Sequence, residues 1–473
     1  MWRGALAAAI LAPLALAVPA AAQQDPGCVG ETEAEGVEQR PGPALRVGIT
    51  PGVQTGQLGT GPAPPRTPED PVRHLEALDR LRGGPGGVPL VLRLHRFFWS
   101  DGEEGIQRFL ALAHRYTDRG FLVELQLRYH PTPEQEGDIE AWTRHVRDVV
   151  RRFGANPRVV AIQVTNEVNL TFSPDSSDGA YEGARDALVQ GVIAAQDEKR
   201  RQGFEQLEIG FNWAYRTDPA SEQSFWNGVR DRGGRPFVEA VDWVGLDAYP
   251  GTFFPPAEAE GEERDGMVNA MSSLRCYLKT PGIPESVPIH VEENGWPTSP
   301  TRPEDKQARV AEILFRAVHD FRGTYNVSDY RWFNLRDGDS TSPNYQVRYG
   351  ILRDDYTEKP AFGVLQRLFA QHARRDAQPP PPAGNEPRPW RAASIHLHCR
   401  RARDGRRARV RPHVIQGSTR LTKVTLRAGG ATFTDYRRPF ATTFRTHARS
   451  VLATFAGRTV RVRCPRKARR GDG

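Results

Sequence analysis

The sequence predicts an α/β protein in which a (β/α)8 barrel is followed by a small all-β module. Short apolar runs alternate with longer amphipathic stretches from Leu45 to about Phe369, the pattern of parallel strands joined by helices. A proline-rich segment then ends this alternation, and the apolar residues beyond it recur with a period of two. The 473 residues are enough for a large domain and an accessory one.

The first 22 residues have the composition of a secretory signal peptide. Arg3 provides a basic start, an apolar run extends from Ala5 to Val18, and small residues lead to Ala22. The run is shorter than the roughly 20 residues that span a bilayer, so we expect cleavage near Ala22 rather than a membrane anchor. Residues 23–43 are polar and form an extended lead-in. We therefore expect a protein that is secreted or attached to the cell surface.

The barrel is predicted to occupy residues 44–373. Helix-like segments such as Gly105–Arg119 and Lys306–Phe321 separate eight strand-like runs, and eight alternations over about 330 residues fit a TIM barrel. A doubly wound sheet is the alternative, but no glycine-rich phosphate loop follows the first strand. The runs are LRVGIT, PLVLRLH, FLVELQL, VVAIQV, LEIGFN, DWVGLDAY, PIHVEE and DYRWFN.

The chain after the barrel divides into a linker, a module and a tail. Residues 374–389 include four consecutive prolines and predict a semi-rigid spacer. Residues 390–467 alternate in polarity between turn signals and predict a basic β-sandwich, and residues 468–473 form a basic tail. The stretch VTLRAGGATFTDYRRPFATTF resembles bacterial immunoglobulin-like modules.

The four cysteines predict disulfides rather than a metal site. An even number in an exported protein favours disulfides, and none has the spacing of a zinc ligand. Of the three possible pairings we expect Cys28–Cys276 in the barrel and Cys399–Cys464 in the module, because each pair then stays within one domain.

Charge is divided unevenly between the two parts. From Arg388 onward there are about 20 more basic than acidic residues, whereas the whole chain has a net charge of +8. The module could dock on an anionic cell-surface polymer or on lipid headgroups, or its arginines could be an ordinary solvated surface. Nucleic acid is not expected as a partner, because the basic residues lack interleaved aromatic ones.

Two glutamates end predicted strands four and seven. Glu167 closes VVAIQVTNE, and Glu293 lies in VPIHVEENGWP, about three βα units later. Because barrel active sites form at the carboxyl ends of the strands, both side chains should face one pocket. A pair of carboxyl groups is what hydrolysis of a glycosidic bond needs, with one as proton donor and the other to attack or to activate water.

These motifs resemble the clan-A retaining glycoside hydrolases, which include cellulases, β-xylosidases and β-1,3-glucanases. In that clan an acid/base follows an asparagine at the end of strand four, as in Asn166-Glu167, and the nucleophile ends strand seven, often before Gly-Trp-Pro, as Glu293 does here. The resemblance covers residues 45–370 and implies Glu167 as acid/base and Glu293 as nucleophile. Glu292 competes for the second role, but strand alternation should turn it away from the barrel interior, with Val291 as an interior filler on the face of Glu293.

The resemblance and the strand ends also imply substrate-binding residues. Asn166 should bond the sugar 2-hydroxyl, and Arg93 should keep the nucleophile ionised. Tyr249 should donate a hydrogen bond to the nucleophile, Trp332 should stack under the sugar, and His130 should contact sugar hydroxyls. No metal or organic cofactor is implied.

Three functions are consistent with this site. The first is hydrolysis of a β-linked glycoside, oligosaccharide or polysaccharide outside the cytoplasm. Transglycosylation would use the same residues, with a sugar hydroxyl in place of water. A non-catalytic carbohydrate-binding or cell-wall protein is the alternative from another class, and the presence of both glutamates argues against it.

Overall fold

The structure is a computed structural model that describes Cys28, residues 32–53, 65–257, 259 and 261–375, and the backbone of seven strands between residues 394 and 463. The predicted signal peptide, nearly all of the linker, and the basic tail lie outside the described residues. The chain divides into two compact units, Met1–Pro379 and Pro380–Gly473. In the part that the structure describes, no helix has both the length and the apolar character needed to cross a bilayer.

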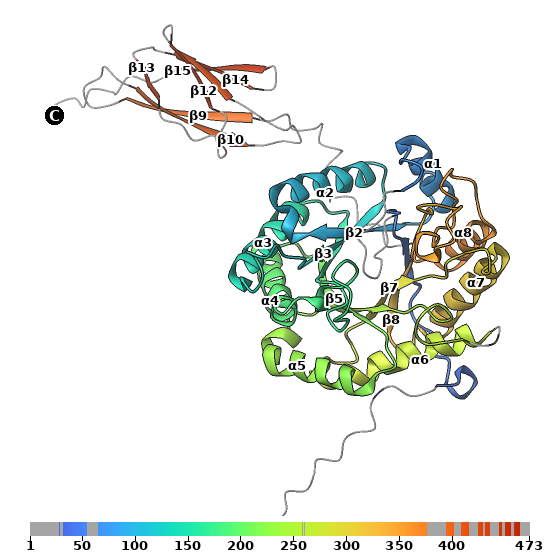
Figure 1. Cartoon of the computed structure of the whole chain (residues 1–473). Coiled ribbons are helices and arrows are strands. Elements are labelled where there is room, and N and C mark those ends of the chain that lie inside the picture. The colour runs from blue at the N-terminus through green and yellow to red at the C-terminus, as the bar shows by residue number, and fades with distance from the viewer. Residues whose placement is uncertain are drawn as a thin grey trace, which may run out of the picture. The chain divides into compact units, whose positions relative to one another are not determined.

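The first unit is a closed barrel of eight parallel strands surrounded by a ring of helices, which confirms the predicted fold class (Figure 1). Consecutive strands pair with each other, and the eighth closes the barrel against the first. The strands are β1 (Arg46–Ile49), β2 (Val91–Phe98), β3 (Leu122–Arg128), β4 (Val159–Val164), β5 (Glu208–Ala214), β6 (Trp243–Asp247), β7 (Ile289–Asn294) and β8 (Val327–Trp332).

A helix follows each strand and packs its apolar face on the outside of the barrel. The helices are α1 (Pro71–Leu81), α2 (Gly102–Thr117), α3 (Ile139–Phe153), α4 (Ala184–Gln202), α5 (Pro219–Val238), α6 (Glu262–Tyr277), α7 (Glu304–Phe321) and α8 (Pro360–His372). Aspartate side chains cap the amino ends of several of them. The Asp70 carboxylate accepts hydrogen bonds from the first turn of α1, where Pro71 needs no partner for a backbone N–H.

The barrel interior is charged rather than aliphatic. Arginines from three strands and carboxyl groups from β3, β7 and β8 fill its middle, a small apolar cluster that includes Val91, Leu122 and Trp243 lies at its amino end, and most other aliphatic residues of the strands face the helices. Glycines at inward positions make room for these long side chains. A Cβ on Gly48 would lie 2.5 Å from Cδ of Arg331, and one on Gly245 would lie 2.9 Å from Cγ of Glu292. The small residues are therefore needed where the charged ones cross the barrel.

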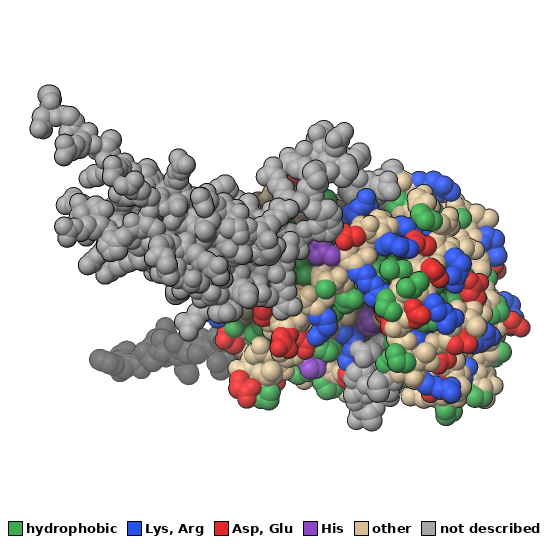
Figure 2. Space-filling model, turned by 90° about the horizontal axis from the view of Figure 1, so that it is seen from above, with side chains coloured by type: hydrophobic (Ala, Val, Ile, Leu, Met, Phe, Trp, Pro, Cys, Tyr) green, Lys and Arg blue, Asp and Glu red, His purple; other side chains and the backbone are tan. Residues whose placement is uncertain are grey.

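The outer surface carries charge of both signs. On the face shown in Figure 2, lysine and arginine side chains are interspersed with aspartate and glutamate. Many of them form exposed pairs along or between helices, such as Arg316 with Glu312 and Arg232 with Asp186. Exposed pairs of this kind contribute little stability each, so the fold depends mainly on the buried layers.

The second unit contains antiparallel strands in two sheets. One sheet has the order β13-β10-β9 and the other β12-β11-β14-β15. The immunoglobulin-like resemblance remains a prediction, as does the Cys399–Cys464 disulfide, because Cys464 lies outside the described residues. The strands are β9 (Ser394–Arg401), β10 (Ala408–Ile415), β11 (Val424–Ala428), β12 (Ala431–Asp435), β13 (Phe444–Thr446), β14 (Ser450–Phe455) and β15 (Arg458–Arg463).

A disulfide joins the lead-in to the barrel. Cys28 bonds Cys276 on α6, with the two Cα atoms 5.4 Å apart, which confirms that predicted pairing. The backbone N–H of Ala34 also donates to Asp265 of the same helix, at 2.7 Å. The lead-in is thus fixed to α6 at two points.

Removing this disulfide should lower stability markedly. The bond closes a loop with a sequence separation of 248 residues. For so long a loop, the double variant Cys28→Ser/Cys276→Ser should lose about 3–5 kcal/mol of unfolding free energy in urea titrations. Reductant should destabilise the barrel of the wild type and leave the barrel of this double variant unchanged. Equal stability of the two proteins would contradict the assignment.

Candidate active site

A pocket opens at the carboxyl ends of the barrel strands. Its volume is about 300 Å3, and the two glutamates that the sequence singles out both line it. The other lining residues come from strand ends and from the loops that follow them. They include His95, Arg96, Gln126, Arg128, Asn166, Ser176, Tyr215, Asp247, Tyr249, Phe333 and Tyr349.

Glu167 lies three residues past the end of β4, on a tightly turned backbone. Thr165 and Glu167 have positive φ angles of 66° and 46°, which non-glycine residues adopt only when their surroundings hold them. Two side chains provide that restraint. Asp178 accepts from the N–H of Asn166, and the Oδ1 of Asn212 accepts from the N–H of Glu167, each at 2.9 Å.

Glu293 lies in β7 and accepts two short hydrogen bonds, besides a longer one of 3.4 Å from Gln126. An Nη1 of Arg93 donates to its Oε1 at 2.8 Å, and the hydroxyl of Tyr249 donates to its Oε2 at 2.7 Å. Both donors stabilise the ionised carboxylate. Burial and the charge of Glu293 raise the pKa of Tyr249, so that its hydroxyl remains a donor.

The two glutamates face each other closely and differ in their environments. Oxygens of Glu167, Asp247 and Glu293 lie within 4.8 Å of one another. Burial, together with the charge of Glu293, raises the pKa of Glu167 to about 8. Its Oε2 accepts a hydrogen bond from Ser177 at 2.9 Å. The pocket therefore holds one carboxyl group whose pKa is raised beside one that accepts hydrogen bonds from an arginine and a tyrosine.

The prediction that Glu292 points away from the barrel interior is wrong. Its side chain is fully buried, and its Oε2 lies 3.3 Å from Nε of Arg93, the same guanidinium that binds Glu293. The physical reason is a bulge in β7: Leu246 pairs with Val291, but the next residue of β6, Asp247, pairs with Glu293. The extra residue turns both carboxyl groups inward. Alternation with the inward Glu292 then places Val291 on the opposite face, so it is not the interior filler that we expected.

The remaining predicted residues divide into one that lines the pocket and two that do not. Asn166 lines it; its Nδ2 donates to the carbonyl of Ser176 at 2.8 Å, which leaves one amide hydrogen for a ligand. His130 lies outside the lining, with its ring stacked on Phe98 at 4.3 Å. Trp332 is fully buried on the strand face opposite to the inward Arg331.

Phe333, the next residue in the chain, provides the aromatic surface that we expected of Trp332. It lines the pocket in edge-on contact with Tyr249 and Tyr349. Asp247 was not among the expected residues either, yet it lines the pocket, and burial with the neighbouring charges raises its pKa well above the ordinary range. The sequence contained a signal for Asp247. In the predicted strand DWVGLDAY it precedes Tyr249 by two positions, and residues two apart in a strand share a face.

The rim of the pocket is aromatic and exposed. Phe172, Phe253 and Phe254 expose 57%, 40% and 41% of their surfaces. In the described part of the chain they are three of the four exposed large hydrophobic side chains, and all three line this pocket. Exposed apolar residues gathered at one concave place indicate a ligand-binding surface.

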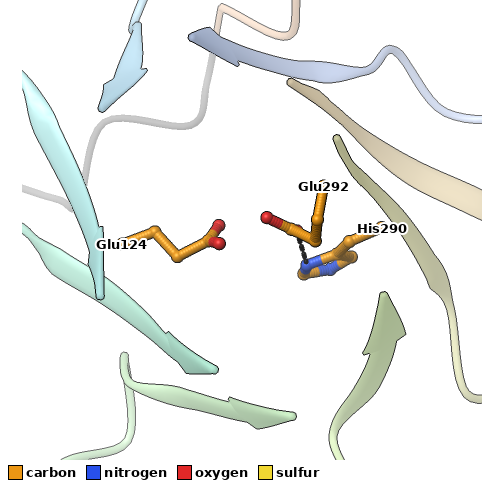
Figure 3. A group of neighbouring side chains, drawn as sticks. All are labelled: Glu124, His290 and Glu292. Atoms are coloured by element: carbon orange, nitrogen blue, oxygen red, sulfur yellow. Dashed lines mark ion pairs between the residues drawn. The ribbon is translucent and has the colours of Figure 1, made fainter. Parts of the chain in front are cut away.

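Two groups of described side chains bring three potential metal ligands together. One is the pocket group of Glu167, Asp247 and Glu293. The other consists of Glu124, His290 and Glu292, which lie nearer the amino ends of their strands and outside the pocket lining (Figure 3). The pocket group faces Arg93, whose positive charge already compensates Glu293, so these residues fit a carboxyl pair better than a cation site.

Comparison with known proteins identifies relatives over part of the chain. No family model matches it. A probable glucan endo-1,3-beta-glucosidase from Aspergillus niger is 27% identical over 147 residues, which are 29% of this chain and 28% of the relative. One from Aspergillus oryzae is 22% identical over 153 residues, 31% of this chain and 30% of the relative. The chain thus spans under a third of the curated relatives' length. The activity in their names, that of a glucan endo-1,3-beta-glucosidase, is one of those found in the clan that the sequence resembles.

Two solved structures illustrate the likeness in fold. GH5_18 from Streptomyces cattleya, in complex with GlcNAc, has a TM-score of 0.46 and 14% identity, and the match covers 72% of this chain and 82% of that one. A beta-glucuronidase from Bacteroides uniformis has a TM-score of 0.42 and 14% identity, covering 89% and 45%.

Replacing Arg93 should destabilise the barrel strongly. The guanidinium is fully buried, and three carboxyl groups lie within 3.4 Å of it. Arg93→Ala leaves these groups buried without their shared cation, which should cost about 3–5 kcal/mol of unfolding free energy in urea titrations. The matched control is the exposed Arg235→Ala, which should behave as wild type. A loss below about 1 kcal/mol for Arg93→Ala would show that the buried network tolerates its absence.

Proposed function

We propose that this protein is a glycoside hydrolase that cleaves β-glycosidic bonds by double displacement, with Glu293 as nucleophile and Glu167 as acid/base. The observation that carries the proposal is the close approach of their carboxyl groups in one pocket, within 4.8 Å. Retaining glycosidases place the two groups roughly 5–5.5 Å apart, whereas inverting enzymes leave about 6.5–9.5 Å for a water molecule.

In the first step the ionised Glu293 attacks the anomeric carbon. The bond from that carbon to the leaving oxygen breaks, and Glu167 gives its proton to this oxygen. The product is a glycosyl ester on Glu293 and a free alcohol. Arg93 and Tyr249 orient the attacking carboxylate through their hydrogen bonds to its two oxygens. Burial supplies the neutral form of Glu167 that this step requires.

In the second step water replaces the enzyme at the anomeric carbon. Esterification removes the negative charge of Glu293, which is one cause of the raised pKa of Glu167. The carboxylate of Glu167, having lost its proton, can then accept one from water while the water oxygen bonds to the sugar. Glu293 leaves as a carboxylate, and both residues return to their starting forms. The close coupling of the pair therefore serves both steps.

The substrate is proposed to be a β-linked glucan or a related polysaccharide. The exposed phenylalanines at the rim suit stacking against the C–H faces of successive sugar rings, outside the subsite where the bond breaks. Because the relatives are named as probable glucan endo-1,3-beta-glucosidases, β-1,3-glucan is the first polymer to assay. Export is supported by the disulfide, which forms in oxidising compartments, and by the composition of the first 22 residues. Transfer to a sugar hydroxyl instead of water would show as longer oligosaccharides among the products.

Substitution of each glutamate should have a distinct kinetic signature. Glu293→Gln should reduce kcat by about 10³-fold or more on every substrate, because no nucleophile remains. Glu167→Ala should react slowly with unactivated glycosides, yet azide should restore turnover of an activated aryl β-glycoside and yield a glycosyl azide. Assays on a panel of aryl β-glycosides and on β-1,3-glucan test both.

The matched control for these variants is Glu198→Gln. Glu198 is a buried glutamate of α4 that pairs with Arg151 and Arg201 outside the barrel interior, so this variant should keep the wild-type rate. Full activity of Glu293→Gln would overturn the proposal. Unchanged glycan binding, with no turnover by the wild type, would favour the binding-protein alternative.

The rate should fall as pH rises through the raised pKa of Glu167. Below about pH 8 the carboxyl group is protonated and can donate, and above it the proton is lost. We therefore expect a basic limb near pH 8 in the profile of kcat/KM on an unactivated glycoside. Glu167→Ala, assayed with an activated leaving group, should lack this limb. A basic limb that persists in this variant would assign it to another group.

A further inference from the structure

A second carboxyl pair lies inside the barrel, beside the catalytic one. Glu124 of β3 and Glu292 of β7 point toward each other across the interior, with His290 next to Glu292 (Figure 3). All three are buried, and none lines the pocket. Nε of Arg93 lies 3.4 Å from Glu124 and 3.3 Å from Glu292, while Nη1 of the same side chain binds Glu293. One guanidinium thus connects this pair to the proposed nucleophile.

The buried charges of this layer do not balance. Three arginines, Arg46, Arg93 and Arg331, contact four buried carboxyl groups, those of Glu124, Glu292, Glu293 and Asp329. Asp329 has two of the arginines, and its pKa is lowered by Arg46 and Arg331 together with His290. Four ionised carboxylates would leave one net negative charge, and three of the four, all but the pocket-lining Glu293, lie away from solvent, where such a charge has a high cost in free energy. One bound proton would make the layer neutral.

Buried polar atoms without hydrogen-bond partners indicate where that proton would bind. Oε1 of Glu124, both carboxyl oxygens of Glu292 and Nδ1 of His290 are buried without a hydrogen-bond donor or acceptor. Nδ1 of His290 lies 3.3 Å from Oε1 of Glu292, and its Nε2 lies 3.2 Å from Asp329. Burial lowers the pKa of His290, so its ring is neutral and offers only one N–H. With that N–H directed at Asp329, Nε of Arg93, itself without a hydrogen-bond partner, faces the carboxyl oxygens at 3.3–3.4 Å, and a proton on one carboxyl group would supply the further donor that this cluster needs.

A cation is a poorer occupant than a proton. Nε of Arg93 and Nη2 of Arg331 already approach the carboxyl oxygens that a metal ion would need, at 3.1–3.4 Å. A divalent ion would add two positive charges to a layer that lacks one. The raised pKa of Glu124, to about 8, results from burial and from the nearby charge of Glu292, as expected for two acids that share a site.

We propose that Glu124 and Glu292 share one proton at neutral pH, and that the single negative charge left on the pair, acting through Arg93, positions Glu293 and sets its ionisation. The two glutamates are positioning residues, because neither reaches the pocket. The groups that face this pair from the surrounding strands are Arg46, Arg93, Gln126, Gln163, Glu208, Asp247, His290, Glu293, Asp329 and Arg331.

The shared proton can be tested without any activity. At pH 6.5 Glu167, Asp247 and Glu222, whose pKa values are also raised, contribute carbonyl stretches of buried carboxylic acids, so infrared difference spectra of the wild type minus each variant are needed to isolate the band of the shared proton. This band should disappear in Glu124→Gln and in Glu292→Gln, because the carboxylate left beside Arg93 no longer needs the proton. Glu198→Gln, in which a paired glutamate is replaced, should keep the band. Carbonyl intensity that stays equal to the wild type in both single variants overturns the proposal, as does stoichiometric binding of Zn2+ by the wild type that either variant abolishes.

The link to Glu293 rests on the proposed function and is tested by the pH dependence of kcat/KM. Each single variant keeps one negative charge on the pair, so its acidic limb should stay within about 0.3 pH units of the wild type. Glu124→Gln/Glu292→Gln removes that charge beside Arg93, which should shift the acidic limb about one unit toward lower pH. Equal acidic limbs in the single and double variants would contradict the link. Loss of the infrared band with no glycosidase activity in the wild type would refute the proposed function and leave the shared proton standing.

Discussion

The structure depends on one buried guanidinium. Arg93 donates to Glu293 and to Gln163 and turns its Nε toward Glu124 and Glu292, so that residues from three other strands converge on it. A barrel filled with aliphatic side chains would need no such group. Here arginines and carboxyl groups fill the middle of the interior, and their charges must be balanced largely without water. The same guanidinium also orients the carboxylate of Glu293 in the pocket.

The features that the sequence could predict are those that depend on local patterns along the chain. Alternating apolar runs predict the barrel, and the glutamates that end two of the runs place Glu167 and Glu293 at the pocket, whereas Arg93 and Tyr249 were implied by the resemblance to the clan. The Cys28–Cys276 pairing followed from keeping each bond within one domain. These inferences succeeded because each depends on local pattern and on strand direction, which the barrel topology converts directly into position.

The predictions that failed depended on the exact register of the strands, which the sequence pattern does not show. A bulge in β7 brings Glu292 inward beside Glu293, and alternation alone cannot reveal a bulge. Trp332 and Phe333 are adjacent aromatic residues. Which of the two faces the pocket depends on the register of β8, in which Arg331 points into the barrel. The supports of Glu167, which include Asp178, Asn212 and Ser177, come from loops and strands distant in the sequence. No short motif encodes such contacts.

The account's central claim is that two facing carboxyl groups act in sequence on one anomeric carbon. The most direct test is the configuration of the sugar first released from a β-1,3-linked oligosaccharide, or from whichever β-glycoside the protein hydrolyses, followed by proton NMR before mutarotation. Two displacements at the same carbon predict that the β-anomer appears first and then equilibrates. The α-anomer as first product would mean a single displacement by water, and would contradict the assignment of Glu293 as nucleophile.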